Sequence, residues 1–367
     1  MNLKKNIKMN RPDLGWREYL RVYKVLRSGK LAQGQNVALF EEEFSKIHGA
    51  RHAIACNSGT SALYLILLGM KIGPGDEVLV PAFTFGATAN AVIMTGAKAI
   101  FVDVDLNSCN MNHEDAQRKI GKNTKAIIVV HLYGNPVDLD HFAKLAETRN
   151  LFLIQDAAQA HLAMWNGSPI AKFGDALAFS FYPTKNMTTI EGGMVLTNNM
   201  QLAQSCSILR NQGMSSRYEY ELPGLNLRMT EVSAAIGLEQ LRKIIRWTER
   251  RIKNARDLRR MLTIQTFQDD PRAKNVYHQF TLQVTPSLRE PLRQHLKNSG
   301  IESDVYYPQS LTTYRVFDSK ASCPNSDRLA SSVISIPIHH RLSRRKLKYL
   351  ASTINSFFAL DKTRVNP

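Results

Sequence analysis

Short apolar runs alternate with helical segments between residues 52 and 154, and this alternation constrains the fold more than any other feature of the chain. The apolar runs are rich in valine and isoleucine, which is typical of parallel strands buried on both faces by crossover helices. The expected strands are His52–Cys56, Glu77–Val80, Ala99–Val102, Ala126–Val130 and Phe152–Ile154. The pattern therefore predicts an α/β fold with a large, mostly parallel sheet covered by helices.

Helical spacing of apolar residues marks the segments around these strands. Two helices are expected before the first strand, at residues 17–28 and 37–48, and each is followed by a glycine that can end it. Further helices are expected between the strands, at residues 60–70, 87–95 and 139–148. No internal repeat interrupts this order.

The pattern changes after Gly224, where a long helical region rich in arginine and glutamate begins. The expected elements from there on are a helix at 230–262, a strand at 277–284, a helix at 288–298, a strand at 303–307 and an amphipathic helix at 343–358. We therefore expect two domains. A large α/β domain would span residues 1–240, with the N-terminal helices at 12–48, and a smaller α+β domain would span residues 241–367.

The composition excludes several classes of protein. No run approaches the ~18 apolar residues of a membrane span, and the basic N-terminus lacks the apolar core of a secretory signal. The four cysteines are far apart without CxxC spacing, which argues against a zinc site and a disulfide framework. We therefore expect a cytoplasmic protein that neither binds a metal nor enters a membrane.

The net charge of +17, from 48 basic and 31 acidic residues, allows nucleic acid, an anionic surface or a polyanionic small molecule as a partner. The basic clusters lie in helical segments, where such runs are usually solvated faces. A nucleotide-linked substrate would also be attracted by this field. Charge alone does not decide between these partners.

Ligands of open parallel sheets bind beyond the carboxyl ends of the strands, so the residues after each strand are the candidates for a site. Gly59, Thr60 and Ser61 lie between a strand and a helix in the stretch NSGTSAL. Small residues, hydroxyls and a helix N-terminus together favour a bound anion. The stretch reads as a phosphate-binding cup, or alternatively as an ordinary capped helix.

Asp156 ends the apolar strand in LFLIQDAAQAH. An aspartate at this position could bind a metal, cap a helix or hold a protonated ring nitrogen. No cluster with metal-ligand spacing accompanies it, so a metal is the weakest of the three. Gln159 follows three residues later and could face the same cavity.

Lys185 follows the strand-like run ALAFSFYPT. A lysine in an apolar pocket can lose its proton near neutrality and form a Schiff base with an aldehyde, although a lone lysine is usually a surface residue. Gly192 and Gly193 would let the chain pass close to a ligand. Phe83 or Phe85, after an earlier strand, could stack on a planar ring, or either could pack in the core.

An anion cup, a stacking aromatic, a carboxylate for a ring nitrogen and an amine for an aldehyde match the chemical features of pyridoxal 5′-phosphate. The motifs also resemble one family, the DegT/DnrJ/EryC1/StrS sugar aminotransferases, which have the fold-type I architecture. The resemblance covers about residues 12–358. It is carried by SGTSAL, GPGDEVLVPAFTFGATANAV, HLYGNPVDLD, QDAAQAH, FSFYPTKNMTTIEGGMV, LRNQG, GLNLRMTEVSAAIGLEQL and SIPIHHRLS.

This resemblance implies a role for each candidate residue. Lys185 would bind the cofactor covalently, Asp156 would hold its pyridine nitrogen, Gln159 would contact the hydroxyl side of the ring, and Phe85 would stack on it. The residues implied for the cofactor phosphate are Gly59, Thr60, Ser61 and Ser180, together with Asn226 of a neighbouring subunit. A homodimer with shared active sites is implied.

The implied activity moves an amino group from an amino acid, L-glutamate in this family, to a nucleotide-linked keto-sugar in amino-sugar biosynthesis. The sequence departs from the usual family pattern at Gln155, Leu162, Gln212 and Thr312. None of these positions is expected to touch the cofactor, and the last two are expected to border the sugar pocket. They affect which sugar is bound, not the class of reaction.

Two other functions fit the same scaffold. One relative of the family dehydrates a sugar carbon with the same cofactor and has histidine in place of the lysine, so Lys185 argues against it. The other is a non-catalytic regulator that binds nucleic acid, which the net charge allows. Regulators of this kind normally carry a separate helix-turn-helix domain, and only about fifty residues precede the first expected strand.

Overall fold

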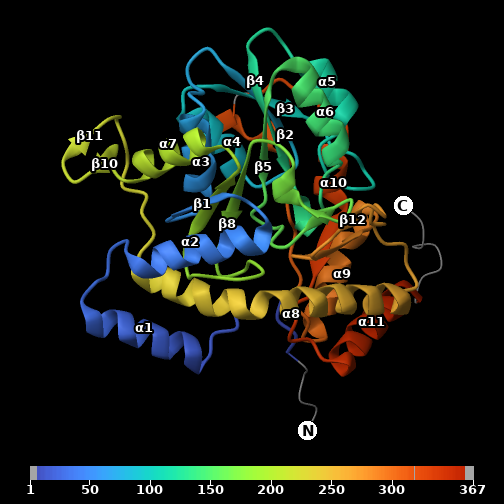
Figure 1. Ribbon diagram of the computed structural model, residues 1–367. Coiled ribbons are helices and arrows are strands. Elements are labelled where there is room, and N and C mark those ends of the chain that lie inside the picture. The colour runs from blue at the N-terminus through green and yellow to red at the C-terminus, as the bar shows by residue number, and fades with distance from the viewer. Residues whose placement is uncertain (1–5, 318, 360–367) are drawn as a thin grey trace.

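A seven-stranded sheet between two layers of helices forms the larger part of the molecule (Figure 1). The computed structural model describes residues 6–317 and 319–359. In spatial order, the strands of the sheet are β1 (His52–Cys56), β9 (Gly193–Thr197), β8 (Ala176–Ser180), β5 (Phe152–Asp156), β4 (Thr124–Val130), β2 (Glu77–Pro81) and β3 (Lys98–Val102).

The strands β3, β2, β4, β5 and β8 run parallel, and β9 lies antiparallel between β8 and β1. Only one strand of the sheet is therefore reversed. The predicted α/β class and the mostly parallel sheet are confirmed.

Alternating residues of each strand contribute to two separate hydrophobic cores. In β2, Leu79 packs into one core, while Val78 and Val80 pack into the other. The helices that contribute to the first core are α2 (Gln35–His48), α5 (His113–Lys119), α6 (Leu139–Arg149) and part of α8 (Glu231–Met261). Those that contribute to the second are α3 (Gly59–Gly69), α4 (Ala87–Met94) and α7 (Met200–Arg210).

The long helix α8 leads from the sheet to a C-terminal α+β unit (Figure 1). A third core there contains the C-terminal half of α8 and Ile7. Its other elements are β13 (Phe280–Gln283), α9 (Pro286–Asn298), β14 (Val333–Ile336) and α11 (Arg344–Ala359). The expected domain boundary at residue 240 falls inside α8, and we propose that the two domains share this helix.

The partner of β13 differs from the expected one. The strand expected at residues 303–307 is not formed, and only Asp304 makes an isolated bridge, to Ser335. The antiparallel partner of β13 is instead β14, whose Ile334 and Ile336 are buried in the C-terminal core. Tyr306 and Tyr307 face a cavity described below, so the pattern of residues 303–307 reflects that cavity and not a sheet.

The N-terminal helices α1 (Trp16–Ser28) and α2 end as the sequence predicts. Gly29 and Gly49 follow them with φ of 68° and 70°, a left-handed conformation that glycine adopts without steric cost. Among the described residues, no helix is long and apolar enough to cross a bilayer.

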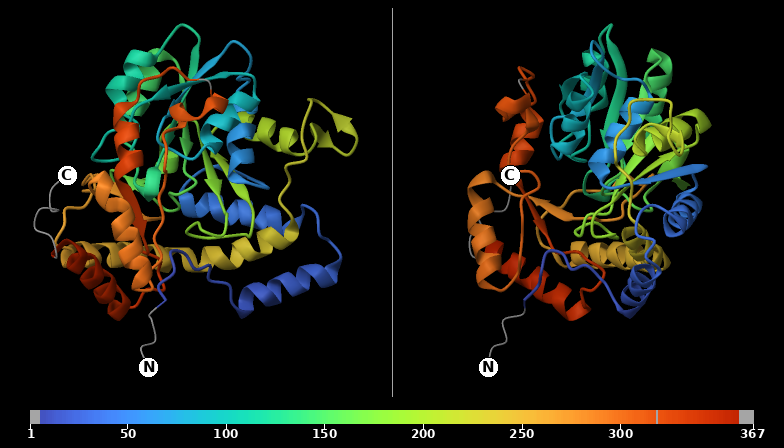
Figure 2. Two further views of the ribbon diagram at one scale, coloured as in Figure 1. Left: turned by 180° about the vertical axis from the view of Figure 1, so that it is seen from behind. Right: turned by 90° about the vertical axis from the view of Figure 1, so that its left-hand side faces the viewer.

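A short hairpin of β10 (Met214–Ser216) and β11 (Glu219–Tyr220) projects from the body of the molecule beyond α7. Both figures of the whole chain show it standing away from the sheet and from the C-terminal unit (Figures 1 and 2).

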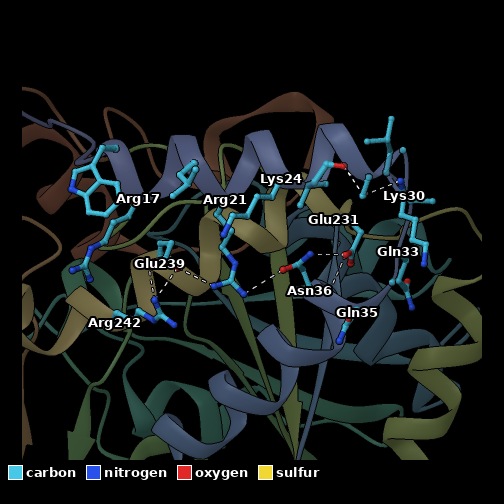
Figure 3. A pocket seen from close by; sticks show the side chains of 18 residues that line it. Arg17, Arg21, Lys24, Lys30, Gln33, Gln35, Asn36, Glu231, Glu239 and Arg242 are labelled. Carbon is cyan, nitrogen blue, oxygen red and sulfur yellow. Dashed lines mark hydrogen bonds and ion pairs between the residues drawn. The ribbon is translucent and has the colours of Figure 1, made fainter.

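Glu231, at the start of α8, ties that helix to α2 (Figure 3). Its carboxylate accepts hydrogen bonds from the backbone N–H groups of Asn36 and Val37, both at 2.9 Å, and from the Asn36 side chain at 2.8 Å. The first N–H groups of a helix have no partner within the helix, so Glu231 satisfies donors that would otherwise lie unpaired. Arg21 of α1 pairs with Glu239 of α8 in the same region, at 2.9 Å.

We predict that Glu231→Ala lowers the free energy of unfolding by about 1–3 kcal/mol, because buried donors at the N-terminus of α2 lose their acceptor. Glu249→Ala, at an exposed position of the same helix, is the matched control and should change it by less than about 0.5 kcal/mol. Urea unfolding followed by circular dichroism measures both. Equal stability of the two variants would contradict the role given to Glu231.

Candidate functional site

A cavity of about 430 Å³ lies at the carboxyl ends of the parallel strands, between the sheet and the C-terminal unit. Its volume is within the usual range for a cofactor or substrate site. Seven of the nine residues expected to bind a cofactor line it: Gly59, Thr60, Phe85, Asp156, Gln159, Ser180 and Lys185. The structure thus brings together residues that are up to 126 positions apart in the sequence, from Gly59 to Lys185.

The N-terminus of α3 forms one wall. Ser58 caps this helix, and its Oγ accepts a hydrogen bond from the Ser61 N–H at 3.1 Å. A Cβ atom at Gly59 would lie 2.7 Å from the Ser180 Cβ, so only glycine lets the end of β8 approach this closely. The unpaired N–H groups at the helix start and the Ser180 hydroxyl therefore face one space, as an anion site requires.

Asp156 lies at the end of β5 and is buried. Its carboxylate accepts hydrogen bonds from the Thr88 hydroxyl at 2.8 Å and from the Ala158 N–H at 3.1 Å. Burial raises the pKa of this carboxyl, while the two hydrogen bonds and the charge of Lys185 act in the opposite direction. Because the pKa remains raised overall, a further cation or N–H donor in the cavity would stabilise the ionised Asp156 carboxylate.

Lys185 lies in the turn after β8, where its backbone N–H donates to the Tyr182 carbonyl at 2.9 Å. Burial lowers the pKa of its amine to about 8, although the Asp156 carboxylate acts to raise it. A substantial fraction of the amine is therefore neutral and nucleophilic slightly above neutral pH. A neutral amine is the form of Lys185 that can react with an aldehyde to give a Schiff base.

Gln159 is fixed by two neighbours. Its Oε1 accepts a hydrogen bond from the Tyr133 N–H at 2.6 Å, and its Nε2 donates to the Tyr307 hydroxyl at 3.2 Å. The ring of Tyr307 lies 6.0 Å from that of Phe85. Phe85 is 62% exposed and Tyr182 is 48% exposed, so two aromatic side chains form an open rim around the cavity.

The remaining two expected binding residues do not line the cavity of their own chain. Ser61 turns its hydroxyl toward Asn57 Oδ1, at 2.6 Å, while its neighbour Ser58 lines the cavity instead. Asn226 is exposed and forms an isolated bridge with Asn211. This location leaves its side chain available to another subunit.

Gly192 and Gly193 do permit a close approach, but to protein atoms. A Cβ atom at Gly193 would lie 2.1 Å from the Ser58 carbonyl oxygen, and one at Gly192 would lie 2.3 Å from Thr189 Oγ1. Gly193 thus lets β9 lie against the N-terminus of α3, while Gly192 lets the preceding turn pack on Thr189 and Met229. They shape the wall of the cavity and do not line it themselves.

Several lining residues were not predicted from the sequence, and four of them follow α8 in the chain: His278 and Gln279, which precede β13, and Tyr306 and Tyr307. His278 is buried, and burial places the pKa of its imidazole well below the ordinary value. The Oε1 atom of Gln279 is buried without a hydrogen-bond donor. Apolar spacing could not reveal these residues, because they reach the cavity only through packing of the C-terminal unit against the sheet.

The residues fit pyridoxal 5′-phosphate. A helix N-terminus with free N–H groups suits the phosphate, a buried carboxylate with a raised pKa suits a protonated ring nitrogen, and a desolvated lysine suits the aldehyde. Within the described ranges, no group of histidine, cysteine, aspartate and glutamate residues has the arrangement of a metal site. The donor set therefore matches the organic cofactor.

Comparisons with known proteins agree with this geometry. The sequence pattern of the DegT/DnrJ/EryC1/StrS aminotransferase family matches residues 12–355. GDP-perosamine synthase of Escherichia coli O157:H7 is 36% identical over 364 residues, which cover 97% of this chain and 99% of that protein. A protein of Geobacillus stearothermophilus named pleiotropic regulatory protein is 35% identical over 353 residues, which cover 93% and 94% of the two chains.

Solved structures show the same fold. The crystal structure of S. venezuelae DesV in complex with a ketimine intermediate is similar with a TM-score of 0.90 and 33% identity, and covers 93% of this chain and 94% of that chain. The PLP-form of Spr1654 from Streptococcus pneumoniae gives a TM-score of 0.90 at 25% identity, with coverage of 96% and 98%. Structures of this fold thus include a form with bound pyridoxal phosphate.

We predict that the reaction of Lys185 with trinitrobenzenesulfonate in the cofactor-free protein is half-maximal near pH 8. Exposed lysines, whose pKa is near 10.4, stay more than about 99% protonated at that pH. Asp156→Asn should move the midpoint below pH 8, because it removes the negative charge that raises the Lys185 pKa. Modification at each pH is followed by peptide mass spectrometry.

Glu147→Gln, which removes an exposed carboxylate on α6, is the matched control and should leave the Lys185 midpoint unchanged. A rate at Lys185 that keeps rising to pH 10 would show an ordinary surface amine.

Proposed function

The chain belongs to the DegT/DnrJ/EryC1/StrS aminotransferase family, and we propose that it transfers an amino group from L-glutamate to a nucleotide-linked keto-sugar with pyridoxal 5′-phosphate as cofactor. The observation that carries the proposal is the meeting of Lys185, Asp156 and the N-terminus of α3 in one cavity. These are the groups that bind the aldehyde, the ring nitrogen and the phosphate of this cofactor.

The chain holds the cofactor at three points. The free N–H groups of Gly59 and Thr60, with the Ser180 hydroxyl, bind the phosphate. Phe85, at the rim, would pack on one face of the ring, and Gln159, whose amide Tyr133 and Tyr307 hold in place, would contact its hydroxyl side. The ring is thus fixed in orientation before a substrate enters.

Lys185 and Asp156 carry the proton chemistry. Bound pyridoxal phosphate supplies an electron sink for the carbon that loses its proton. Asp156 keeps the ring nitrogen protonated, and its hydrogen bonds from Thr88 and Ala158 fix the carboxylate for this task. The amine of Lys185, with a pKa near 8, would take the proton from the α-carbon of the amino acid and return it to the cofactor carbon that carried the aldehyde oxygen.

The part of the cavity lined by His278 and Gln279 suits a sugar. His278 stays neutral because burial lowers its pKa, and Gln279 has an unpaired amide oxygen that can accept a hydrogen bond from a hydroxyl. GDP-perosamine synthase, a 36% identical relative, has a nucleotide-linked sugar in its name. Both observations support a sugar as the amino acceptor.

We further propose that two copies of the chain form a homodimer with shared active sites. Asn226 is exposed and lies outside the cavity of its own chain, and the family resemblance gives it a role at the phosphate of the neighbouring subunit. The open rim at Phe85 and Tyr182 leaves room for such a contribution.

A regulatory function is the second candidate, because the net charge is +17 and one relative is named a pleiotropic regulatory protein. Lys185 and Asp156 both line the cavity, and the presence of these two groups favours catalysis over a regulatory function. An electrophoretic shift assay with duplex DNA between 50 and 200 mM salt, roughly the range over which phosphate contacts weaken, separates the candidates. Catalysis without a salt-dependent shift supports the aminotransferase.

We predict that Lys185→Ala lowers amine transfer by at least about 10³-fold, because both the covalent attachment and the proton transfer depend on this amine. The variant should also lose the visible absorbance of protein-bound pyridoxal phosphate. Products from a panel of nucleotide keto-sugars with glutamate are identified by mass spectrometry. Lys172→Ala, at an exposed lysine on the protein surface, should keep both activity and absorbance.

Full activity of Lys185→Ala would contradict the role of this residue in cofactor attachment and proton transfer. A deoxy-sugar without an added amino group would identify a dehydratase instead of an aminotransferase.

A further inference from the structure

Helix α1 carries an apolar stripe on its outer side. Trp16, Tyr19, Leu20, Tyr23 and Leu26 are all exposed, and most neighbours in this set are three or four residues apart, so they share one side of the helix. Trp16 is 68% exposed and Tyr23 is 58% exposed. A surface helix of a globular protein normally turns such a stripe toward the core.

The inner side of α1 is largely polar. Glu18, the only acidic residue of the helix, is 1% exposed, and its carboxylate accepts a hydrogen bond from Gln240 at 2.7 Å and pairs with Lys243 of α8. Val25 is the only apolar residue of α1 that is buried. The helix therefore buries its carboxylate and leaves its aromatic residues outside, where they suit an apolar partner.

Four cations accompany the stripe without acidic partners. Arg17, Lys24 and Arg27 lie on α1 and Lys30 follows it, all four are exposed, and no carboxylate of residues 6–317 or 319–359 forms an ion pair with them. The guanidinium carbon of Arg17 instead lies 5.5 Å from the centre of the Trp16 ring. Arg17, Lys24 and Lys30 line the groove between α1 and α8 (Figure 3).

The acidic side chains of this groove are already bound within the chain. Glu231 accepts hydrogen bonds from the N-terminus of α2. Glu239 pairs with Arg21 at 2.9 Å and with Arg242 at 3.1 Å. The unpaired charges that the groove presents to solvent are therefore positive.

The basic surface continues along α8, because Arg242 also lines a second hollow there. Arg246 and Arg250 line this hollow and are exposed. Among the described residues of the hollow, lysine and arginine outnumber the acidic residues, which are Asp13 and Glu249. Asp13 is already paired within the chain.

We propose that this surface of α1 and α8 binds an anionic lipid bilayer, with the aromatic stripe among the headgroups and the cations on the lipid phosphates. Tryptophan, tyrosine and leucine on one side of a helix, with lysine and arginine beside them, are typical of helices that lie in the plane of a membrane surface. Binding of this kind needs no helix that spans the bilayer. The inference gives the net charge of +17 a role and does not depend on the aminotransferase function.

A second copy of the chain and nucleic acid fit this surface less well. Two copies paired symmetrically through α1 would bring the same unpaired cations together, and like charges across an interface oppose association. Nucleic acid would contact the cations through its phosphates but would leave Leu20 and Leu26 exposed. A bilayer surface accommodates both the cations and the apolar stripe. Figures 1 and 2 show α1 at the edge of the molecule, outside α8, where a flat surface can reach it.

Co-sedimentation of the full chain with lipid vesicles tests the apolar stripe. Vesicles of phosphatidylcholine with about 30% phosphatidylglycerol should bind the protein at least about 10-fold more tightly than pure phosphatidylcholine, and added salt should weaken this binding. Trp16→Ser combined with Tyr23→Ser should weaken it by at least about 10-fold. Met94→Ser combined with Met200→Ser, at exposed apolar residues of α4 and α7, is the matched control and should bind as the wild type does.

Arg17→Gln combined with Lys24→Gln tests the cations. Each cation near an anionic surface strengthens binding by about fivefold, so this double variant should bind anionic vesicles about 25-fold more weakly. Lys122→Gln combined with Lys125→Gln removes the same charge from exposed positions just before and within β4, and should bind as the wild type does.

Three results would overturn the inference. The first is equal binding to neutral and anionic vesicles, or binding to neither. The second is an equal loss of binding in the variants of α1 and in their controls. The third is a lower oligomeric mass of the Trp16→Ser, Tyr23→Ser protein in light scattering, because the stripe would then be an interface between copies of the chain. Unchanged mass, with a loss of binding confined to the variants of α1, supports the inference.

Discussion

The buried carboxylate of Asp156 is the constraint on which the rest of the site depends. A carboxylate removed from water loses several kcal/mol of solvation unless it is paired, and here the Thr88 hydroxyl and the Ala158 N–H compensate only part of that loss, since its pKa remains raised. Asp156 lies at the carboxyl end of a central strand, where the cavity offers its carboxylate a further partner. A protonated ring nitrogen is a partner that completes the pairing.

Close contacts at two glycines position the N-terminus of α3 beside the strands β8 and β9. Gly59 allows the start of α3 to touch Ser180 at the end of β8, and Gly193 allows β9 to touch Ser58. Larger residues at these two positions would separate the helix N-terminus from the strand that leads to Lys185. The phosphate site and the lysine are thus placed relative to each other by the absence of side chains, while hydrogen bonds orient Asp156 and Gln159.

The mostly parallel sheet, most of its strands and helices, and seven of the residues that line the cavity could be predicted from the sequence, because strand ends, small residues and a lone lysine leave local signals. The helix α7 also carries a readable signal, with Leu202, Cys206 and Leu209 buried at helical spacing, although it was not assigned. Thr88 and Gln279 could not be assigned roles, since they meet Asp156 and the cavity only through tertiary packing. Tyr306 and Tyr307 led to the prediction of a strand that is not formed, because their aromatic side chains line the cavity and do not pack in a sheet.

We propose that one cavity holds pyridoxal phosphate through Lys185. The most direct measurement is borohydride reduction of the purified protein with pyridoxal phosphate, followed by peptide mass spectrometry to locate the attached cofactor. We expect one reduced pyridoxyl phosphate per chain, on the peptide that contains Lys185. A label spread over surface lysines, or a label on a single different lysine, would contradict it.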